Sequence, residues 1–119
     1  MTILLTLLGT AYGDLECTQS GPQGEDGSYC IVMPTEVPFN GRSVIWAHGF
    51  QDADTPVGIP LDQLCFDGVC IPDLLTGMGF AFATNSYSRT GLAVVEGIVD
   101  ILDWVDIFAD YNGDPEKVY

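Results

Sequence analysis

Val44-Ile45-Trp46-Ala47-His48-Gly49-Phe50 is the segment from which the fold of this chain is best inferred. Its apolar, β-branched first half is typical of a strand buried on both faces of a sheet. The change to a polar His-Gly pair marks the end of that strand, and open α/β sheets bind ligands at the carboxyl ends of their strands. Gly49, beside the only histidine of the chain, lets backbone N–H groups approach a ligand closely. The segment therefore predicts a buried strand followed by a binding or catalytic loop.

Apolar runs on either side of this segment predict the rest of a sheet. Strands are expected at 29–33, 43–47 and 80–84, and another opens at 117–119. Residues 14–28 are rich in Gly, Ser and acidic side chains and predict a loop, and a short helix is expected near Asp73. The alternation of strands and helices indicates the α/β class, in one domain without an internal repeat or a linker.

The clearest predicted helix spans residues 91–111. Apolar residues recur there at steps of three and four and form one stripe, while the acidic residues lie largely off it. Asn112-Gly113 and Asp114-Pro115 then end the helix. We expect the helix to pack on one face of the sheet, chiefly through Val94, Ile98, Leu102 and Val105, with Ile101 and Phe108 in the same stripe. The acidic residues expected in solvent are Glu96, Asp100, Asp103, Asp106 and Asp110.

The charge of the chain excludes several classes of partner. Its 119 residues include 17 acidic and 3 basic ones, which gives a net charge of −14. Neutralising phosphate requires clustered Lys and Arg, so we expect no nucleic acid and no anionic membrane surface as a partner. A hydrophobic fraction of 47% and an aromatic fraction of 11% indicate a folded domain. No apolar run is long enough to predict a membrane span.

Residues 1–13 have the features of a signal peptide. Ile3 to Leu8 form an apolar core, and Ala11-Tyr12-Gly13 matches a small-x-small cleavage site, although no Lys or Arg precedes the apolar run. The alternative is an ordinary buried segment. A signal peptide here predicts a secreted, periplasmic or extracellular protein whose mature domain comprises residues 14–119.

The four cysteines fall into two local pairs, which favours an oxidising compartment. Four cysteines allow three pairings, and the sequence leaves all three open. Pairing Cys17 with Cys30 and Cys65 with Cys70 is the simplest, because an Asp-Gly turn lies between the latter two. The Cys-x2-Cys spacing of a zinc site is not found, so no metal is expected.

Residues 29–119 resemble the secreted α/β-hydrolase superfamily of serine esterases and peptidases. The segment 44–50 is similar to the strand that ends in a His-Gly oxyanion loop, and 79–87 is similar to the next strand with its polar exit. The long helix followed by 113–119 resembles the part of these enzymes that leads into the strand carrying the nucleophile.

This resemblance implies the N-terminal portion of an α/β-hydrolase-type open sheet, in an enzyme that cleaves small-molecule or peptide esters or amides without a cofactor. The backbone N–H of Phe50 or of Gln51 would stabilise the oxyanion, and His48 and Gly49 would shape the loop. The family's G-x-S-x-G elbow does not occur in these 119 residues, and its catalytic acid and base follow that elbow. We therefore expect this chain alone to be inactive and to self-associate through exposed sheet edges. The alternative is a small exported α/β domain that binds without catalysis.

Other residues that could carry chemistry have simpler interpretations. In the family the catalytic base comes late in the chain, so we expect His48 to brace its loop by hydrogen bonds. Ser43, Ser86 and Ser88 have no base placed beside them, and we expect them to be solvated or hydrogen-bonded. Asp52-Ala53-Asp54 lacks the downstream glutamate that a calcium loop needs.

Overall fold

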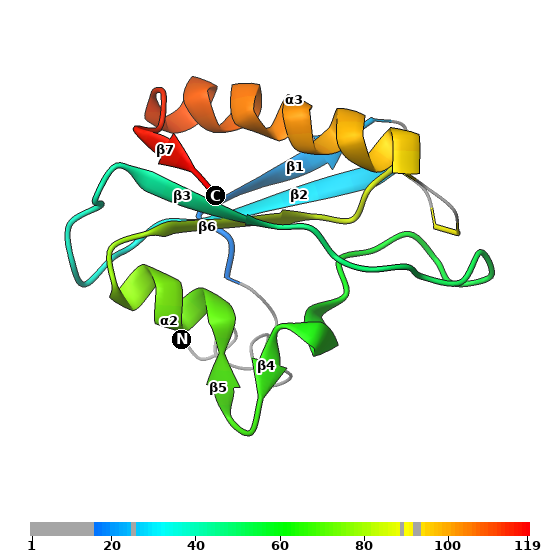
Figure 1. The fold of residues 1–119 in the computed structure, drawn as a ribbon, viewed down its shortest axis with the longest axis horizontal. Helices are drawn as coiled ribbons and strands as arrows, with labels where there is room; N and C mark the ends of the chain where they lie inside the picture. The colour runs from blue at the N-terminus through cyan, green and yellow to red at the C-terminus, as the bar shows by residue number, and fades with distance from the viewer. Residues whose placement is uncertain (1–15, 25, 89, 92–93) are drawn as a thin grey trace, which may run out of the picture.

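The computed structural model describes residues 16–119 except 25, 89 and 92–93, and its largest element is a five-stranded mixed sheet (Figure 1). The order across the sheet is β1-β2-β6-β3-β7. Strand β2 is antiparallel to β1 and β6, whereas β3 is parallel to both β6 and β7. The chain is therefore of mixed α/β class, and the proposed signal peptide at 1–13 lies outside the described residues. The strands are β1 (Gln19–Gln23), β2 (Gly27–Val32), β3 (Arg42–Trp46), β6 (Ala81–Asn85) and β7 (Lys117–Val118).

The strands expected from the apolar runs are all present, with ends shifted by one or two residues. The prediction of a loop over 14–28 is wrong, because β1 and the start of β2 lie within that range. Strand β1 gives no apolar signal, since it is an edge strand with side chains that bond to a helix. Gln19 exchanges amide hydrogen bonds with Asn112, and Pro22 is tolerated on a strand at the edge of the sheet formed by the described residues.

The core lies between the sheet and α3 (Val94–Asn112), which runs along one side of the sheet in Figure 1. Trp104 and Phe108 of α3 are fully buried, and their ring centroids lie 5.1 Å apart. The strand residues beneath them include two alanines, which leave room for the large rings. This buried cluster consists of Tyr29, Ile31, Ala81, Ala83, Trp104 and Phe108.

The apolar stripe predicted for the long helix is only partly correct. Ile98 and Leu102 are 56% and 65% exposed, so they do not pack on the sheet. Asp100, which was expected in solvent, is buried. The helix is turned so that the face carrying Asp100, Trp104 and Phe108 meets the sheet, because those rings fill the space above the alanines and the carboxylate finds hydrogen-bond donors there. Val105 packs partly buried against the core as expected, and the side chain of Val94 lies outside the described part.

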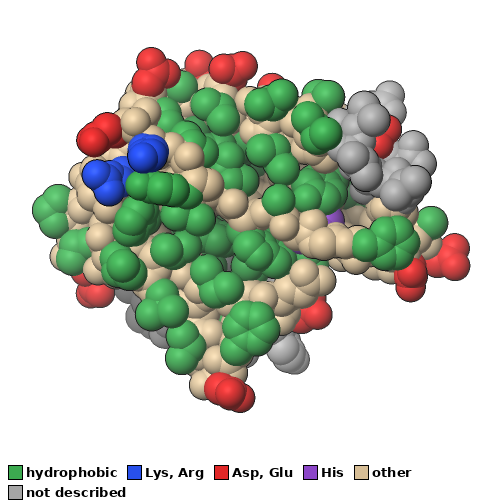
Figure 2. All heavy atoms as spheres, in the orientation of Figure 1, with side chains coloured by type: hydrophobic (Ala, Val, Ile, Leu, Met, Phe, Trp, Pro, Cys, Tyr) green, Lys and Arg blue, Asp and Glu red, His purple; other side chains and the backbone are tan. Residues whose placement is uncertain are grey.

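Helix α2 (Ile71–Gly77) lies on the side of the sheet opposite α3 (Figure 1). Pro72 occupies its first turn, where the missing N–H has no intrahelical partner in any case. A short 3₁₀ helix, η1 (Leu61–Gln63), and a small hairpin of β4 (Cys65–Phe66) and β5 (Val69–Cys70) precede it. Asp67 and Gly68 both have positive φ, as a two-residue hairpin turn requires. Figure 2 shows hydrophobic side chains across this view of the surface, with acidic ones mostly around its rim.

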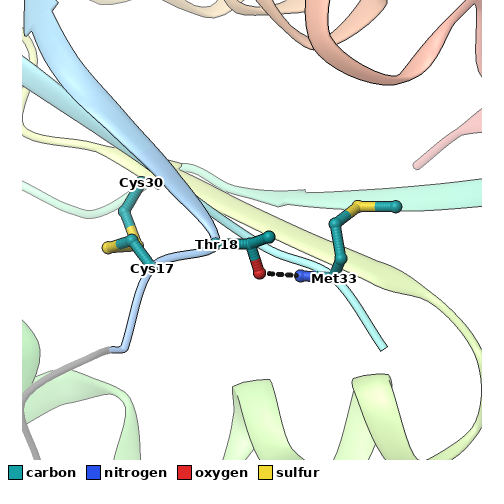
Figure 3. The surroundings of a disulfide bond; sticks show 4 residues. All are labelled: Cys17, Thr18, Cys30 and Met33. Atoms are coloured by element: carbon teal, nitrogen blue, oxygen red, sulfur yellow. Dashed lines mark hydrogen bonds between the residues drawn. A yellow bond between two sulfur atoms is a disulfide. The ribbon is translucent and has the colours of Figure 1, made fainter. Parts of the chain in front are cut away.

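Two disulfide bonds link the cysteines in the local pairing, Cys17–Cys30 and Cys65–Cys70. The first ties the chain ahead of β1 to the buried Cys30 of β2, next to a hydrogen bond from Met33 N–H to Thr18 Oγ1 of 2.9 Å (Figure 3). The second closes the β4–β5 hairpin. Both bonds are compatible with an extracellular location. No helix in the described part is long and apolar enough to cross a membrane.

Candidate functional site

The candidate site is formed where the chain leaves β3 and β6. These strands are parallel, and their register places Trp46 opposite Thr84. Thr84 Oγ1 donates to the Trp46 carbonyl at 3.0 Å, so the two exits start side by side. Since parallel strands end at the same edge of a sheet, the loop at 48–51 and the segment after Asn85 emerge together.

His48 is 5% exposed and is held by its neighbours. Its ring lies against that of Tyr87, with the centroids 4.0 Å apart. Its Nδ1 lies 2.7 Å from the carbonyl oxygen of Gly49, and because a carbonyl only accepts, Nδ1 carries the proton. Its Nε2 is buried without a partner among the residues described. His48 is therefore a brace inside its own loop, with no nucleophile hydrogen-bonded to it in that part of the chain.

Two hydrogen bonds fix the peptide planes of the loop. Tyr87 Oη donates to the carbonyl of His48 at 2.8 Å, and His48 Nδ1 donates to the carbonyl of Gly49. The described residues contain no cis peptide bond, and in a trans peptide the C=O and the following N–H point in opposite directions. The Gly49 N–H is therefore turned away from Tyr87, and the Phe50 N–H is turned away from the buried His48 ring.

The far end of the loop is anchored on the segment that follows Tyr87. Gly91 N–H donates to the Gln51 carbonyl at 2.7 Å, and the two residues form an isolated antiparallel bridge. The side chain of Phe50 is 68% exposed between these anchors. Gln51 Oε1 is buried with no hydrogen-bond partner in the described ranges. The loop is thus fixed at both ends and presents Phe50 to solvent.

A buried polar network joins β1, β6 and α3 beside the site. Asn85 Nδ2 donates to Gln23 Oε1 at 3.0 Å, and Gln23 Nε2 donates to the backbone carbonyl of Asp100 at 2.6 Å. The Asp100 carboxylate accepts from the backbone N–H and the hydroxyl of Ser88, each at 2.7 Å. This network fixes the exit of β6 to the helix.

The three candidate serines have structural surroundings. Ser86 is fully buried, accepts from Ser28 N–H at 2.9 Å and donates to the Tyr87 carbonyl at 2.8 Å. Ser88 is bonded to Asp100. Ser43 is fully buried within β3, and its hydroxyl has no partner among the residues that the structure describes. None of the three donates to His48 in the described part.

Sequence reasoning missed the residues that support the loop, namely Gln23, Asn85, Tyr87 and Asp100. Gln23 lies in a segment expected to be a loop, and Asp100 in a helix face expected to be solvated. In the sequence, Tyr87 is only one residue of the polar segment that follows a strand. Its left-handed backbone, with φ of 58°, has no signal in the sequence because Gly, Asn and Asp are the residues that usually mark such positions.

No protein-family profile, no curated protein and no solved structure matches this chain. A functional assignment therefore rests on the geometry of the site. Among the described residues there is no group of three or more His, Cys, Asp or Glu side chains arranged to hold a metal ion. The arrangement offers backbone N–H donors on an anchored, partly exposed loop, and such donors bind a carbonyl oxygen or an anion.

Proposed function

We propose that this chain is the N-terminal part of a secreted serine hydrolase of the α/β-hydrolase type, which cleaves ester or amide bonds. The loop at 48–51 supplies oxyanion-hole donors, with the Phe50 N–H as the principal one. The observation that carries the proposal is the hydrogen bond between His48 and the Gly49 carbonyl, because it points the Phe50 N–H away from the buried His48 ring at the carboxyl end of a central parallel strand.

The order of the sheet supports this assignment. Counted along the chain, the five strands lie in the order first, second, fourth, third, fifth, and only the second runs opposite to the others. In α/β hydrolases one oxyanion-hole N–H comes from the loop after the third strand, and the nucleophile lies on a strand-to-helix elbow. Here the third strand is β3, and the loop at 48–51 follows it directly.

The position of β7 is compatible with a nucleophile elbow close to the loop at 48–51. Strands β3 and β7 are parallel neighbours, with Ser43 opposite Val118, and Ile45 N–H donates to the Tyr119 carbonyl at 2.9 Å. A chain that continues beyond Tyr119 in this register would pass His48 about four residues later. A nucleophile on the turn after that strand would therefore stand beside the Phe50 N–H, as acyl transfer requires.

A direct test compares a substitution that removes the Phe50 N–H with one that changes only the Phe50 side chain. In a protein extended past Tyr119, we expect a G-x-S-x-G motif within about ten residues of it. Phe50→Pro deletes the N–H, whereas Phe50→Ala keeps it and changes a side chain that is 68% exposed. We expect Phe50→Pro to lower kcat by roughly 10²- to 10³-fold, and Phe50→Ala to change it far less. Equal effects of the two substitutions would contradict the assignment of the donor.

The 119-residue chain gives a second test, because it has the donors without the elbow. It should not hydrolyse activated esters above background, and serine-reactive phosphonates should not label it. Stoichiometric labelling of Ser43, Ser86 or Ser88 would overturn the proposal. If an extended protein also lacks any phosphonate-reactive serine, the chain is a binding domain and not part of a hydrolase.

Secretion is part of the proposal, and it is supported by the two disulfide bonds. Export followed by N-terminal sequencing should find a mature chain that starts at Asp14. Peptides from the non-reduced protein should contain the Cys17–Cys30 and Cys65–Cys70 links. A protein that keeps residues 1–13 and has free thiols would contradict this part of the proposal.

A further inference from the structure

Two residues other than glycine have a left-handed backbone in the described part of the chain, Asp67 with φ of 51° and Tyr87 with φ of 58°. Asp67 occupies the first position of an Asp-Gly hairpin turn, which requires this conformation. Tyr87 is not in such a turn, and its bulky side chain makes the conformation unfavourable. Something in its surroundings must therefore impose it.

Both chain neighbours of Tyr87 are held in place, each by a different element. Ser86 N–H donates to the carbonyl of Ser28 in β2 at 3.0 Å, and Ser28 N–H donates back to the Ser86 hydroxyl. On the other side, Ser88 donates its N–H and its hydroxyl to the buried Asp100 carboxylate of α3. The chain at Tyr87 is therefore clamped between the sheet and the helix.

Helix α3 also makes room for the ring of Tyr87. A Cβ atom added to Gly97 would lie 3.3 Å from Cε1 of that ring, closer than ordinary contact. Glycine is unfavourable inside a helix, so its presence three residues after the start of α3 needs a reason. The close approach of the Tyr87 ring supplies one.

We propose that Tyr87 is a positioning residue of the loop at 48–51, held in its conformation by Asp100 through Ser88. Its ring supports the His48 ring, and its hydroxyl holds the His48 carbonyl, so that Tyr87 sets the direction in which the Gly49 and Phe50 N–H groups point. Burial, and to a smaller extent the charge of Asp100, raises the pKa of Tyr87. The catalytic consequence rests on the proposed function, whereas the positioning does not.

Nuclear magnetic resonance can test the positioning directly, because the chain contains a single histidine and its ring signals are therefore unambiguous. Tyr87→Phe keeps the ring and removes the hydroxyl, so we expect the Gly49 and Phe50 amide signals to move while the His48 ring signals change little. Tyr87→Leu removes the ring, and the His48 ring protons should lose their ring-current displacement. Tyr29→Phe is the matched control, since it removes a hydroxyl bonded to Tyr111 and should leave these signals unchanged.

The role of Asp100 is tested in the same spectra. Asp100→Asn weakens the clamp on Ser88, and we expect it to move the Gly49, Phe50 and His48 signals. Asp106→Asn makes the same change on an exposed residue of the same helix and should not move them. If the signals of the loop are unchanged in Tyr87→Phe and Tyr87→Leu, Tyr87 does not position the loop. If they respond to Tyr87 but not to Asp100, the clamp on Ser88 is not what holds Tyr87.

Kinetics of an extended, active protein would show the catalytic consequence. We expect Tyr87→Phe to lower kcat roughly tenfold with little change in KM, because a misdirected donor weakens transition-state binding more than substrate binding. A purely structural role would instead lower the amount of folded enzyme without changing kcat per active site. If the extended protein has no reactive serine but the loop signals still change in the Tyr87 variants, the proposed hydrolase function is refuted. The positioning role of Tyr87 then stands. An unchanged kcat would refute the catalytic consequence.

Discussion

Replacing Trp104 by alanine should be among the most destabilising substitutions in this chain. The side chain is fully buried, 5.1 Å from the Phe108 ring and above the alanines of β6. A buried aromatic side chain removes about 150–250 Å² from water. At about 25 cal/mol per Å² this corresponds to roughly 4–6 kcal/mol, close to the 3–5 kcal/mol typical of such truncations. Since small domains are stable by about 5–15 kcal/mol, this loss is a large fraction of the total and would unfold a chain at the lower end of that range.

Leu102→Ala on the same helix is the matched control. Leu102 is 65% exposed, so it gains only about a third of the roughly 1.5–3 kcal/mol that full burial of a leucine contributes. We expect a loss below about 1 kcal/mol, measured by urea unfolding followed by far-UV circular dichroism. Losses of similar size in the two variants would refute the orientation of α3.

Two further predictions concern a tyrosine pair and a glycine. The hydrogen bond with Tyr111, together with burial, raises the pKa of Tyr29 from 10.0 to about 12. The folded chain therefore binds this proton more tightly than the unfolded chain does. The contribution to the free energy of unfolding is fully present below pH 10 and is lost as the pH rises to about 12. Tyr111→Phe should reduce the fall in unfolding free energy between about pH 10 and pH 12, and an unchanged fall would contradict the pairing. Gly27→Ala places a Cβ 2.5 Å from the Gln23 carbonyl oxygen and 2.8 Å from that of Tyr87. It should cost about 1–3 kcal/mol in thermal unfolding, whereas Gly58→Ala, with nothing within 4 Å, should be nearly neutral.

The strands of the central sheet could be predicted because their residues are buried and their apolar runs are continuous. Strand β1 could not, since its alternate residues bond to α3 instead of packing, and a strand of Gln, Ser, Gly and Pro has the composition of a loop. The orientation of α3 failed for a related reason. Periodicity gave equal weight to Leu102 and Phe108, and it did not show that Trp104 would face two alanines.

The loop of the candidate site could be located from its sequence, but its support could not. His48 and Gly49 follow a recognisable strand, and the end of such a strand is a common place for a site. The clamp at Tyr87 joins Ser86 to Ser28 and Ser88 to Asp100, residues that meet only after the sheet and α3 have packed. A polar contact between elements distant in the chain leaves no local pattern in one sequence.

Three features that are unfavourable for stability lie close to the loop at 48–51. A left-handed tyrosine costs of the order of 1–3 kcal/mol, and a glycine inside a helix costs about 0.5–1 kcal/mol relative to alanine. Asp100 adds a carboxylate that is 5% exposed, which is tolerated because Ser88 supplies two donors. Each feature could be exchanged for a more stable one if packing were the only requirement. Gly97 lies against the Tyr87 ring and Asp100 holds the neighbouring Ser88, so all three features lie around the residue whose hydroxyl and ring contact His48.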